Sequence, residues 1–577
     1  MSKKQNIAES QIQTRIVLVF LFVGLLGILI IGRLFSLQIL QHQFYLALAS
    51  ETQEVYKNLF PQRGSIYVRE KDQLYPLVTN RDYYLVYAEP VKVKDSAKIV
   101  DSLTPILDLK EDEWKSLLTS LNKTGDPYEP IKHKVTKPQV EQIESLNLEG
   151  IGFIPETFRF YPEKNIGGHI FGFVGFKDEE KVGQYGLEGY FNDELSGKSG
   201  LIKSVKDALG SLITIGPRSV QKAEDGVDLI LTIDRQVQFT ACQKLKEFYD
   251  WYQASSGTVI IANPKTGAIV AMCSFPDFDP EFYNEVEDIN YFNNPAIFGA
   301  YEPGSVFKTI TMGAALNEGK ITPETTYEDT GELKVGPYKI TNFDNKAYGQ
   351  QTMTQALSQS LNLGAAFAAQ QIGGSTLADY VKRFGFGTNT GIELNTEVPG
   401  NIDNLDRRGD VYYFTASYGH GITVTPLQLV AAYGAIANNG RLMKPYIVGE
   451  KIYSNGRVEI TQPQFVRQVI ENKTATILTG MLTQVVESSY DKKARVPNYY
   501  LAAKTGTALI PGSGGGYSNQ TIHTIVGFGP VSDPSFVILI KIDKIKRGPA
   551  YASDSVGPLF SQLSQFLLNY YQIPPDY

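Results

Sequence analysis

A serine and a lysine three positions apart could supply a nucleophile and its base. Ser305 and Lys308 lie in the stretch Tyr-Glu-Pro-Gly-Ser-Val-Phe-Lys, which spans residues 301–308. If a helix begins at Ser305, positions i and i+3 share a face, so the lysine amine can lie beside the serine hydroxyl. The other interpretation is an ordinary helix start, because serine is a favoured N-cap residue and the lysine would then be a surface cation. The pair alone does not decide between the two.

Two further polar motifs lie far along the chain. Ser360 and Asn362 occupy a helical stretch rich in small residues, and the run Lys504-Thr505-Gly506-Thr507 is embedded in an apolar, strand-like segment. A glycine inside a strand often marks the close approach of a ligand or of another backbone. Polar groups on three separate elements can converge on one groove, so the ordered set favours a nucleophilic site over a simple helix cap.

Copies of the same motifs occur where chemistry is not expected. Ser120 and Lys123 repeat the serine–lysine spacing, but Thr-Gly-Asp-Pro follows at once, and the whole stretch is predicted to be a loop. Another Lys-Thr-Gly, at residues 265–267, lies in a predicted hairpin turn. Residues that are contiguous in one loop cannot approach a substrate from separate elements, so both copies are interpreted as structural.

The elements that must position the reactive groups begin near residue 226. There the sequence changes to a strand-like run, an amphipathic helix over 235–252 and two apolar strands within 257–275. A further helix is predicted from Ser305 to Gly319. Residues 44–225 are mixed, with glycines concentrated in residues 167–200. The main domain boundary is therefore predicted at this point.

Composition argues against several classes of protein. The 577 residues are too many for one compact core, so several domains are expected. The formal net charge of −7 gives no electrostatic reason to expect nucleic acid as a partner. The five histidines and two cysteines have no metal-ligand spacing, and Cys242 and Cys273 are predicted to be buried free thiols rather than a disulfide.

One segment near the N-terminus is predicted to span a membrane. Residues 16–32 carry no charge over 17 positions and lie between Arg15 and Arg33; as a helix they would cover about 26 Å. The apolar character resumes after Arg33, so a single anchor is predicted over residues 16–40. A cleaved signal peptide is the alternative, but no small-residue cleavage pattern follows. Positive residues before the span predict that residues 1–15 are cytoplasmic and that the chain after about residue 40 lies on the other side of the membrane.

Taken in order, the three motifs resemble the active-site set of penicillin-recognising serine D,D-transpeptidases. The resemblance extends to residues 417–445. It also includes three motifs similar to those in the pedestal of class B penicillin-binding proteins, which begin at Pro61, Arg159 and Tyr185. Four positions depart from the residues usual in the family, which leaves drug affinity and substrate preference open: Val68, Val306, His420 and Ala503.

The resemblance implies an α+β or α/β fold. Residues 226–577 would form a serine β-lactamase-like transpeptidase domain with an antiparallel sheet flanked by helices. Residues 41–225 would form an elongated, mixed α+β pedestal, the dimerisation domain of these proteins. The one transmembrane helix would be residues 16–40, after a cytoplasmic N-terminus of residues 1–15.

The groups themselves suggest how Ser305 is activated. A serine hydroxyl is a weak nucleophile, so a neutral amine must take its proton. Because the pKa of lysine is about 10.4, the site must lower that of Lys308 by roughly three units through desolvation and a neighbouring cation, which Lys504 can supply. His420 is the other candidate base, although a packing or hydrogen-bonding role is favoured for it.

The remaining polar residues would complete acyl transfer. Ser360 would relay a proton between Lys504 and the departing amine. Asn362 would donate its amide to the substrate backbone and contact Lys308.

The resemblance further implies how the substrate is held. It places the oxyanion hole at the backbone N–H groups of Ser305 and Thr507. The Lys-Thr-Gly-Thr strand, with Thr505, Gly506 and Thr507, would then bind the terminal carboxylate through its two threonine hydroxyls.

The implied reaction cleaves the D-Ala-D-Ala bond of a cell-wall stem peptide. D-Ala leaves, an acyl-Ser305 ester forms, and an amine of a second stem peptide resolves it as a cross-link; a β-lactam acylates the same serine. No cofactor or metal is required. The expected partners are the cytoplasmic membrane and a membrane glycan polymerase. Division and elongation both stay open, with division favoured.

Four other functions are weaker interpretations. A β-lactamase would need a deacylating carboxylate in a Glu-x-x-Leu-Asn loop, but in the nearest string, residues 391–395, Glu393 directly precedes Leu394. A membrane-anchored β-lactam sensor would need several spans and a cytoplasmic effector, whereas only about 15 residues precede this span; an inactive scaffold is the related alternative. A bifunctional enzyme is disfavoured because no acidic glycosyltransferase motif is evident.

Overall fold

The contacts within the chain divide it into two units. The computed structural model describes residues 21–35, 54–70, 73–123, 125–163, 167–177, 180–205, 219–488, 492–511 and 516–577. One unit comprises residues 1–61 and 197–225, and the other comprises residues 62–196 and 226–577. In the first unit, three antiparallel strands form a small sheet with β8 in the centre, namely β1 (Glu54–Leu59), β8 (Gly200–Val205) and β9 (Ser219–Gln221).

The predicted membrane anchor is described in part. Residues 21–35 form a helix whose apolar side chains are exposed, Ile28 by 70%. The rest of the predicted span, residues 16–20 and 36–40, lies outside the described residues. Among the helices that the structure does describe, none has the length and apolarity needed to cross a bilayer. The span therefore stays a prediction.

In the second unit, segments from both sides of residue 226 share one sheet. Strand β10 pairs in parallel with β2 and antiparallel with β18, and β2 pairs antiparallel with β3. The bounds are β2 (Ile66–Glu70), β3 (Gln73–Ala88), β10 (Asp228–Leu231) and β18 (Val448–Ile452). The first pedestal motif is therefore tied directly to the strand that opens the second half of the chain.

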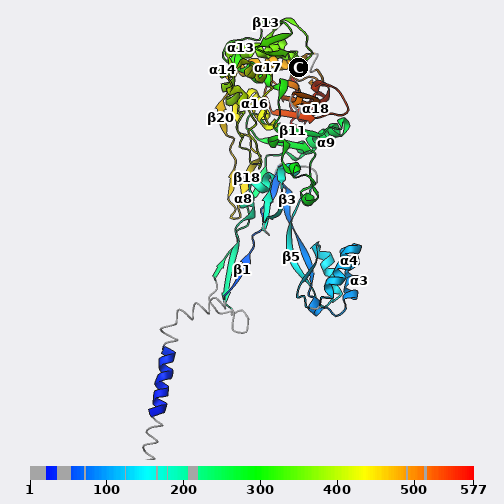
Figure 1. Ribbon diagram of the computed structural model, residues 1–577, viewed down its shortest axis with the longest axis vertical. Coiled ribbons are helices and arrows are strands. Elements are labelled where there is room, and N and C mark those ends of the chain that lie inside the picture. The colour runs from blue at the N-terminus through cyan, green and yellow to red at the C-terminus, as the bar shows by residue number, and fades with distance from the viewer. Residues whose placement is uncertain are drawn as a thin grey trace, which may run out of the picture. The chain divides into compact units, whose positions relative to one another are not determined.

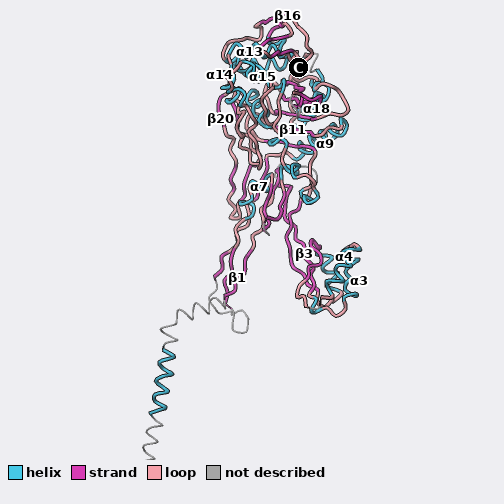
Figure 2. Tube along the Cα trace, in the orientation of Figure 1, coloured by secondary structure: helices cyan, strands magenta, loops and turns pink. Residues whose placement is uncertain are grey.

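A small helical lobe is built on the far end of β3. That strand pairs with two more strands, and three helices bury Leu103, Leu121 and Ile143 against them (Figures 1 and 2). Its elements are α3 (Ser96–Leu107), α4 (Glu111–Leu121), β4 (Glu129–Val135), α5 (Lys137–Ser145) and β5 (Ile151–Phe160). Ser120 lies in the last turn of α4 rather than in the predicted loop, because apolar Leu117 and Leu121 extend that helix into the core.

The three pedestal motifs meet at one buried carboxylate. Glu188, from the third motif, is fully buried on the short helix α7 (Gly186–Tyr190). Its two oxygens accept hydrogen bonds from Nε of Arg63 and Nε of Arg159, each at 2.6 Å. Buried charges persist in proteins when they are paired and hydrogen-bonded. One residue from each motif therefore takes part in this ion cluster, which joins three segments that are far apart in sequence.

The rest of the second unit surrounds a five-stranded antiparallel sheet. Its order is β12-β11-β23-β22-β21. The bounds are β11 (Ser256–Ala262), β12 (Ile269–Phe275), β21 (Ala502–Pro511), β22 (Tyr517–Gly529) and β23 (Phe536–Asp543). Alternation along β11 sends Val259 and Ile261 into one core and Ile260 into the other. Both faces of the sheet are therefore apolar and need covering.

Helices cover both faces of this sheet. On the face of Val259, α9 (Arg235–Tyr252) and α18 (Ala552–Tyr570) complete the core (Figure 1). The other core contains α11 (Lys308–Asn317) and α16 (Pro426–Ala437). The predicted antiparallel sheet flanked by helices is confirmed.

The prediction of two free thiols is wrong. Cys242 of α9 and Cys273 of β12 form a disulfide, with their Cα atoms 5.5 Å apart. The helix folds back onto the strand, so residues that are distant in sequence become neighbours in the core. Separation along the chain is therefore no guide to this pairing.

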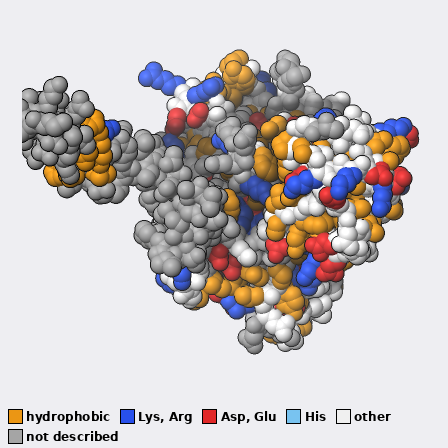
Figure 3. All heavy atoms as spheres, turned by 90° about the horizontal axis from the view of Figure 1, so that it is seen from below, with side chains coloured by type: hydrophobic (Ala, Val, Ile, Leu, Met, Phe, Trp, Pro, Cys, Tyr) orange, Lys and Arg blue, Asp and Glu red, His pale blue; other side chains and the backbone are white. Residues whose placement is uncertain are grey.

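The surface carries charges of both signs. On the face drawn in Figure 3, Lys and Arg side chains lie intermixed with Asp and Glu among apolar groups. The prediction that nucleic acid is not a partner stays a prediction.

Candidate active site

A tight turn presents Ser305 at the start of a helix. Residues Gly304–Phe307 form a 3-10 turn that leads directly into α11, close to the predicted helix start. Gly304 has a φ of +58°, which favours glycine, and its N–H donates to the carbonyl of Gly419 at 3.1 Å. Ser305 is half-buried, whereas its neighbour Val306 is buried. The turn therefore leaves the serine partly accessible on a rigid base.

Lys308 is buried beside Ser360. Its side chain is only 1% exposed, and Nζ donates to the Ser360 carbonyl at 2.5 Å and to the Ser360 hydroxyl at 3.3 Å. Burial, together with the charge of Lys504, holds the pKa of Lys308 well below its usual range. A neutral amine at this position is the form that can accept a proton.

Ser360 sits in an unusual backbone conformation between two helices. It has a φ of +58° in the short connection from α12 (Met353–Ser358) to α13 (Asn362–Ile372). Non-glycine residues with positive φ are uncommon and cluster at functional sites. The kink turns both the carbonyl and the hydroxyl of this residue toward the Lys308 amine.

Asn362 differs from its predicted contacts. Its Nδ2 donates to the carbonyl of Thr341, at the end of β15 (Tyr338–Thr341), at 2.9 Å. Among the hydrogen bonds of the described residues, none joins Asn362 to Lys308. The side chain is half-buried, so this amide ties the start of α13 to a neighbouring hairpin. Its predicted bond to the substrate stays a prediction.

The Lys-Thr-Gly-Thr run lies on the edge strand β21, against the Ser305 turn. A Cβ atom on Gly506 would lie 3.1 Å from the carbonyl oxygen of Pro303 and 3.2 Å from Cγ1 of Val306. Only glycine allows this approach without a shift of the neighbours. Because β21 is the last strand of its sheet, an extended peptide could add alongside it.

The side chains of this strand differ in exposure. Lys504 is 1% exposed and donates from Nζ to the carbonyl of Thr505 at 3.1 Å. Thr505 is half-buried and Thr507 is exposed. The Thr507 hydroxyl accepts a hydrogen bond from the N–H of Ala552 at 3.1 Å, so its own proton can be offered elsewhere.

His420 lies beside the Ser305 turn, in the loop after α15 (Asp410–Ser417). Burial, and then the charge of Lys308, lower the pKa of His420 to about 4, so the ring is neutral near pH 7. Its Nδ1 is 3.4 Å from the hydroxyl of Tyr517. This contact agrees with the predicted hydrogen-bonding role of His420.

Sequence reasoning missed Glu302 and Tyr517, which contact each other next to this loop. Glu302 belongs to the quoted Ser305 motif, so its charge was a signal that could have been used. Tyr517 follows a glycine-rich stretch, and nothing in the sequence points to its partner. The Tyr517 hydroxyl donates to Glu302 at 3.1 Å.

Glu393, which lies in the string nearest to the β-lactamase motif, has a structural contact. One oxygen of Glu393 accepts a hydrogen bond from the N–H of Ile447 at 3.0 Å, and its pKa is raised by burial. Glu393 therefore holds a loop to the segment before β18.

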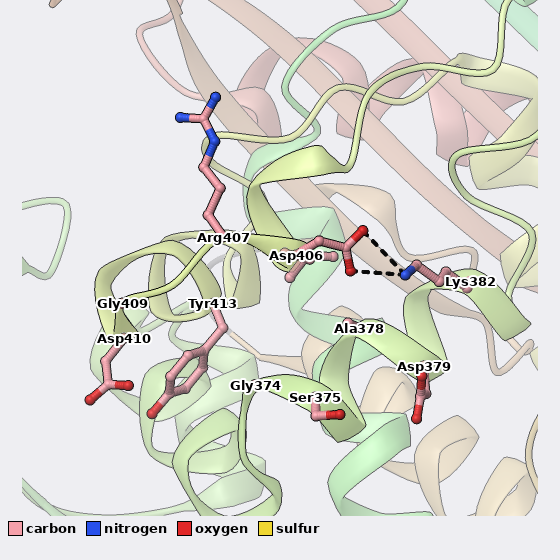
Figure 4. A pocket seen from close by; sticks show the side chains of 11 residues that line it. Gly374, Ser375, Ala378, Asp379, Lys382, Asp406, Arg407, Gly409, Asp410 and Tyr413 are labelled. Atoms are coloured by element: carbon pink, nitrogen blue, oxygen red, sulfur yellow. Dashed lines mark hydrogen bonds and ion pairs between the residues drawn. The ribbon is translucent and has the colours of Figure 1, made fainter.

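A separate polar pocket of about 380 Å³ lies between two helices (Figure 4). Its charged lining residues include Lys382 of α14 (Gly374–Arg383), which pairs with Asp406 at 2.9 Å. None of the predicted site residues lines this pocket.

Comparison with known proteins places this chain in a family. Residues 257–565 match the penicillin binding protein transpeptidase domain, and residues 58–231 match the penicillin-binding protein dimerisation domain. Stage V sporulation protein D of Bacillus subtilis (strain 168) is 30% identical over 561 residues, covering 97% of this chain and 86% of that protein. The peptidoglycan D,D-transpeptidase FtsI homolog of Mesostigma viride is 30% identical over 596 residues, covering 98% of this chain and 97% of that protein.

A solved structure shares the fold. Penicillin binding protein 2X from Streptococcus thermophilus superimposes with a TM-score of 0.74 at 22% identity, covering 89% of this chain and 80% of that one. Fold and site together define a penicillin-recognising transpeptidase. The chain belongs to the penicillin-binding-protein transpeptidase family, and within it to class B. It is a peptidoglycan D,D-transpeptidase, an activity that this family combines with covalent binding of penicillin.

Proposed function

We propose that Ser305 is the nucleophile of this transpeptidase and that Lys308 is its general base. The Ser305 hydroxyl attacks the carbonyl carbon of the D-Ala-D-Ala bond while its proton passes to the neutral Lys308 amine. A base works best when its pKa lies near the operating pH, and both burial and Lys504 lower that of Lys308. The observation that carries this proposal is the environment of the Lys308 amine. The amine is buried and hydrogen-bonded to Ser360, and the charge of Lys504 lowers its pKa.

The proton then returns to the leaving group. The Ser360 hydroxyl is 3.3 Å from Lys308, so it can pass a proton to the departing D-Ala amine as the C–N bond breaks. An acyl-Ser305 ester remains. The amine of a second stem peptide attacks this ester, and Ser305 regains its proton as the cross-link forms.

Substrate binding is proposed along the edge of β21. The donor peptide would add as an extended strand beside Thr505, Gly506 and Thr507, with the threonine hydroxyls on its terminal carboxylate. The N–H groups of Ser305 and Thr507 would stabilise the oxyanion, a contribution of about 3–4 kcal/mol per donor in comparable sites. The close packing of Gly506 on the Ser305 turn supports this arrangement.

Covalent labelling tests these roles. Fluorescent penicillin should form a long-lived adduct with the full-length protein and no adduct with Ser305→Ala. Release of D-Ala from a stem-peptide donor then measures the reaction itself. Rapid turnover of the adduct would indicate a β-lactamase, and a wild-type protein without any adduct would contradict the proposal.

We also propose where the enzyme works. Residues 16–40 would anchor it in the cytoplasmic membrane with residues 1–15 inside the cell and the catalytic domain outside, beside a membrane glycan polymerase that serves division. The run of exposed apolar side chains on the helix at 21–35 supports the anchor.

Two experiments test this location. Extraction with alkaline carbonate should leave the full chain in the membrane fraction and release a variant without residues 1–40. Protease added to intact spheroplasts should digest the catalytic domain; its protection would contradict this orientation.

A further inference from the structure

A second polar cluster adjoins the Ser305 turn and has no part in the proposed acylation. Its centre is Glu302, which precedes Pro303 in that turn. One carboxylate oxygen accepts a hydrogen bond from the N–H of Gly421 at 3.0 Å, and the other accepts one from the Tyr517 hydroxyl at 3.1 Å. Glu302 is half-buried, and burial raises its pKa while the two hydrogen bonds favour its charged form.

Aromatic rings surround this carboxylate. The centroids of Tyr418 and His420 are 5.1 Å apart, and those of His420 and Tyr517 are 5.4 Å apart. Burial and the charge of Glu302 raise the pKa of Tyr418 to about 12, and they also raise that of Tyr517. With His420 neutral as well, the three rings carry no formal charge near pH 7, and Glu302 is the acidic group among these four residues.

The cluster is placed beside the reacting groups by hydrogen bonds from both sides. Gly419 accepts from Gly304 of the Ser305 turn, and Gly421 donates to Glu302, so the loop of His420 is fixed to that turn twice. Lys308 is near enough for its charge to act on His420. Tyr517 begins β22, the hairpin partner of β21, and is 46% exposed. Solvent, and hence a ligand, can therefore reach the cluster.

We propose that Glu302, Tyr418, His420 and Tyr517 form a subsite for a primary ammonium group of the peptidoglycan stem peptide. A carboxylate attracts an ammonium ion and accepts its hydrogen bonds, and neutral aromatic rings stabilise a cation near their faces. The reaction uses an amine as its second substrate, and an alkyl amine is protonated at neutral pH. The subsite rests on the proposed function. The ammonium could belong to the acceptor or to a side chain of the donor peptide.

A purely structural role for Glu302 predicts different behaviour. In that case the carboxylate merely holds the loop at Gly421 and thereby shapes the Ser305 turn. Glu302→Gln separates the two roles, because the amide oxygen can still accept from Gly421 while the negative charge is lost. Glu393→Gln is the matched control: its carboxylate is also partly buried, has a raised pKa and accepts from a backbone N–H at 3.0 Å.

The experiment measures penicillin acylation and transpeptidation on the same full-length preparations. We expect Glu302→Gln to acylate with benzylpenicillin at the wild-type rate, because that ligand carries no ammonium, and to raise one substrate KM about tenfold, the loss expected for one charge-assisted contact. A rise in acceptor KM alone assigns the site to the acceptor amine. A rise in donor KM that disappears when the donor amine is acetylated assigns it to the donor. Glu393→Gln should change neither KM.

Two results would overturn the subsite. If Glu302→Gln leaves both KM values unchanged, the Glu302 carboxylate does not bind an ammonium group of either substrate. If it slows benzylpenicillin acylation as much as transpeptidation, Glu302 acts by shaping the turn. A wild-type protein that forms no penicillin adduct would instead contradict the proposed function, and the subsite with it.

Discussion

The amine of Lys308 lies 2.5 Å from the carbonyl oxygen of Ser360 and 3.3 Å from its hydroxyl, although Lys308 begins α11 and Ser360 lies in the connection from α12 to α13. The carbonyl contact fixes the amine, and the hydroxyl contact offers a path for its proton. Because the amine is buried and the charge of Lys504 acts on it, the pKa of Lys308 is lowered and its neutral form is favoured. The predictions on the reaction follow from this relationship.

The first prediction concerns pH. The base must be neutral, so the second-order rate of penicillin acylation should rise with pH as Lys308 loses its proton, at a pH well below the usual lysine range. Removing the neighbouring cation in Lys504→Gln should raise the pKa of Lys308 and move this rising limb to higher pH. Stopped-flow acylation from pH 5 to pH 10 measures the limb.

The Lys-Thr-Gly copy in the hairpin turn provides the control for that experiment. Lys265→Gln removes a cation from the same motif outside the site and should leave the limb in place. If Lys504→Gln lowers the rate at every pH without moving the limb, Lys504 acts on the substrate and not on Lys308.

The second prediction concerns the backbone of Ser360. Its φ of +58° costs about 1 kcal/mol for a residue with a Cβ atom, so Ser360→Gly should raise the free energy of unfolding by about that amount relative to Ser360→Ala. Both variants lose the hydroxyl, so D-Ala release should fall about 100-fold in each. Urea unfolding and a D-Ala assay give the two values. Equal stability of the two variants would show that the conformation carries no such cost.

The third prediction concerns Gly506. A methyl group there would meet Pro303 and Val306 and push β21 away from the Ser305 turn. Since a misplacement on the order of 1 Å can cost about 100-fold in rate, Gly506→Ala should slow penicillin acylation by between about 10- and 100-fold. In Gly480→Ala, on the helix α17 (Asn472–Glu487), the added atom meets nothing within 4 Å. That control should acylate normally and gain about 0.5–1 kcal/mol of stability. Normal acylation by Gly506→Ala would show that a methyl group fits between β21 and the Ser305 turn.

The sequence predicted local structure well where the residues of a motif also determine the secondary structure around it. Ser305 lies in the turn that leads into α11, where Pro303 and Gly304 favour a bend and apolar residues follow, and Gly506 lies in a strand because its neighbours are strand formers. Both local elements were predictable. The approach of Gly506 to Val306 was suggested only by the presence of glycine in a strand, and its geometry required the fold.

The contacts that sequence could not supply all join distant segments. Asn362 bonds to Thr341 because a hairpin packs beside α13, and no spacing rule links these residues. Tyr517 reaches Glu302 only because β22 runs beside β21 and places its first residue near the Ser305 turn. Such pairings depend on how elements pack, which periodicity and propensity do not determine.

The fourth prediction concerns the disulfide, which is the clearest case of this kind. Cys242 and Cys273 close a loop of 31 residues between α9 and the edge strand β12. Cross-linking a loop of this size restricts the unfolded chain and should contribute about 4 kcal/mol to the free energy of unfolding. The double variant Cys242→Ala/Cys273→Ala should therefore unfold at a lower urea concentration, and reduction of the wild type should have the same effect. Thiol titration of the denatured wild type should find none before reduction and two after it. Two reactive thiols in freshly isolated protein would contradict the disulfide. The double variant would then lose only the packing energy of the two cysteine side chains.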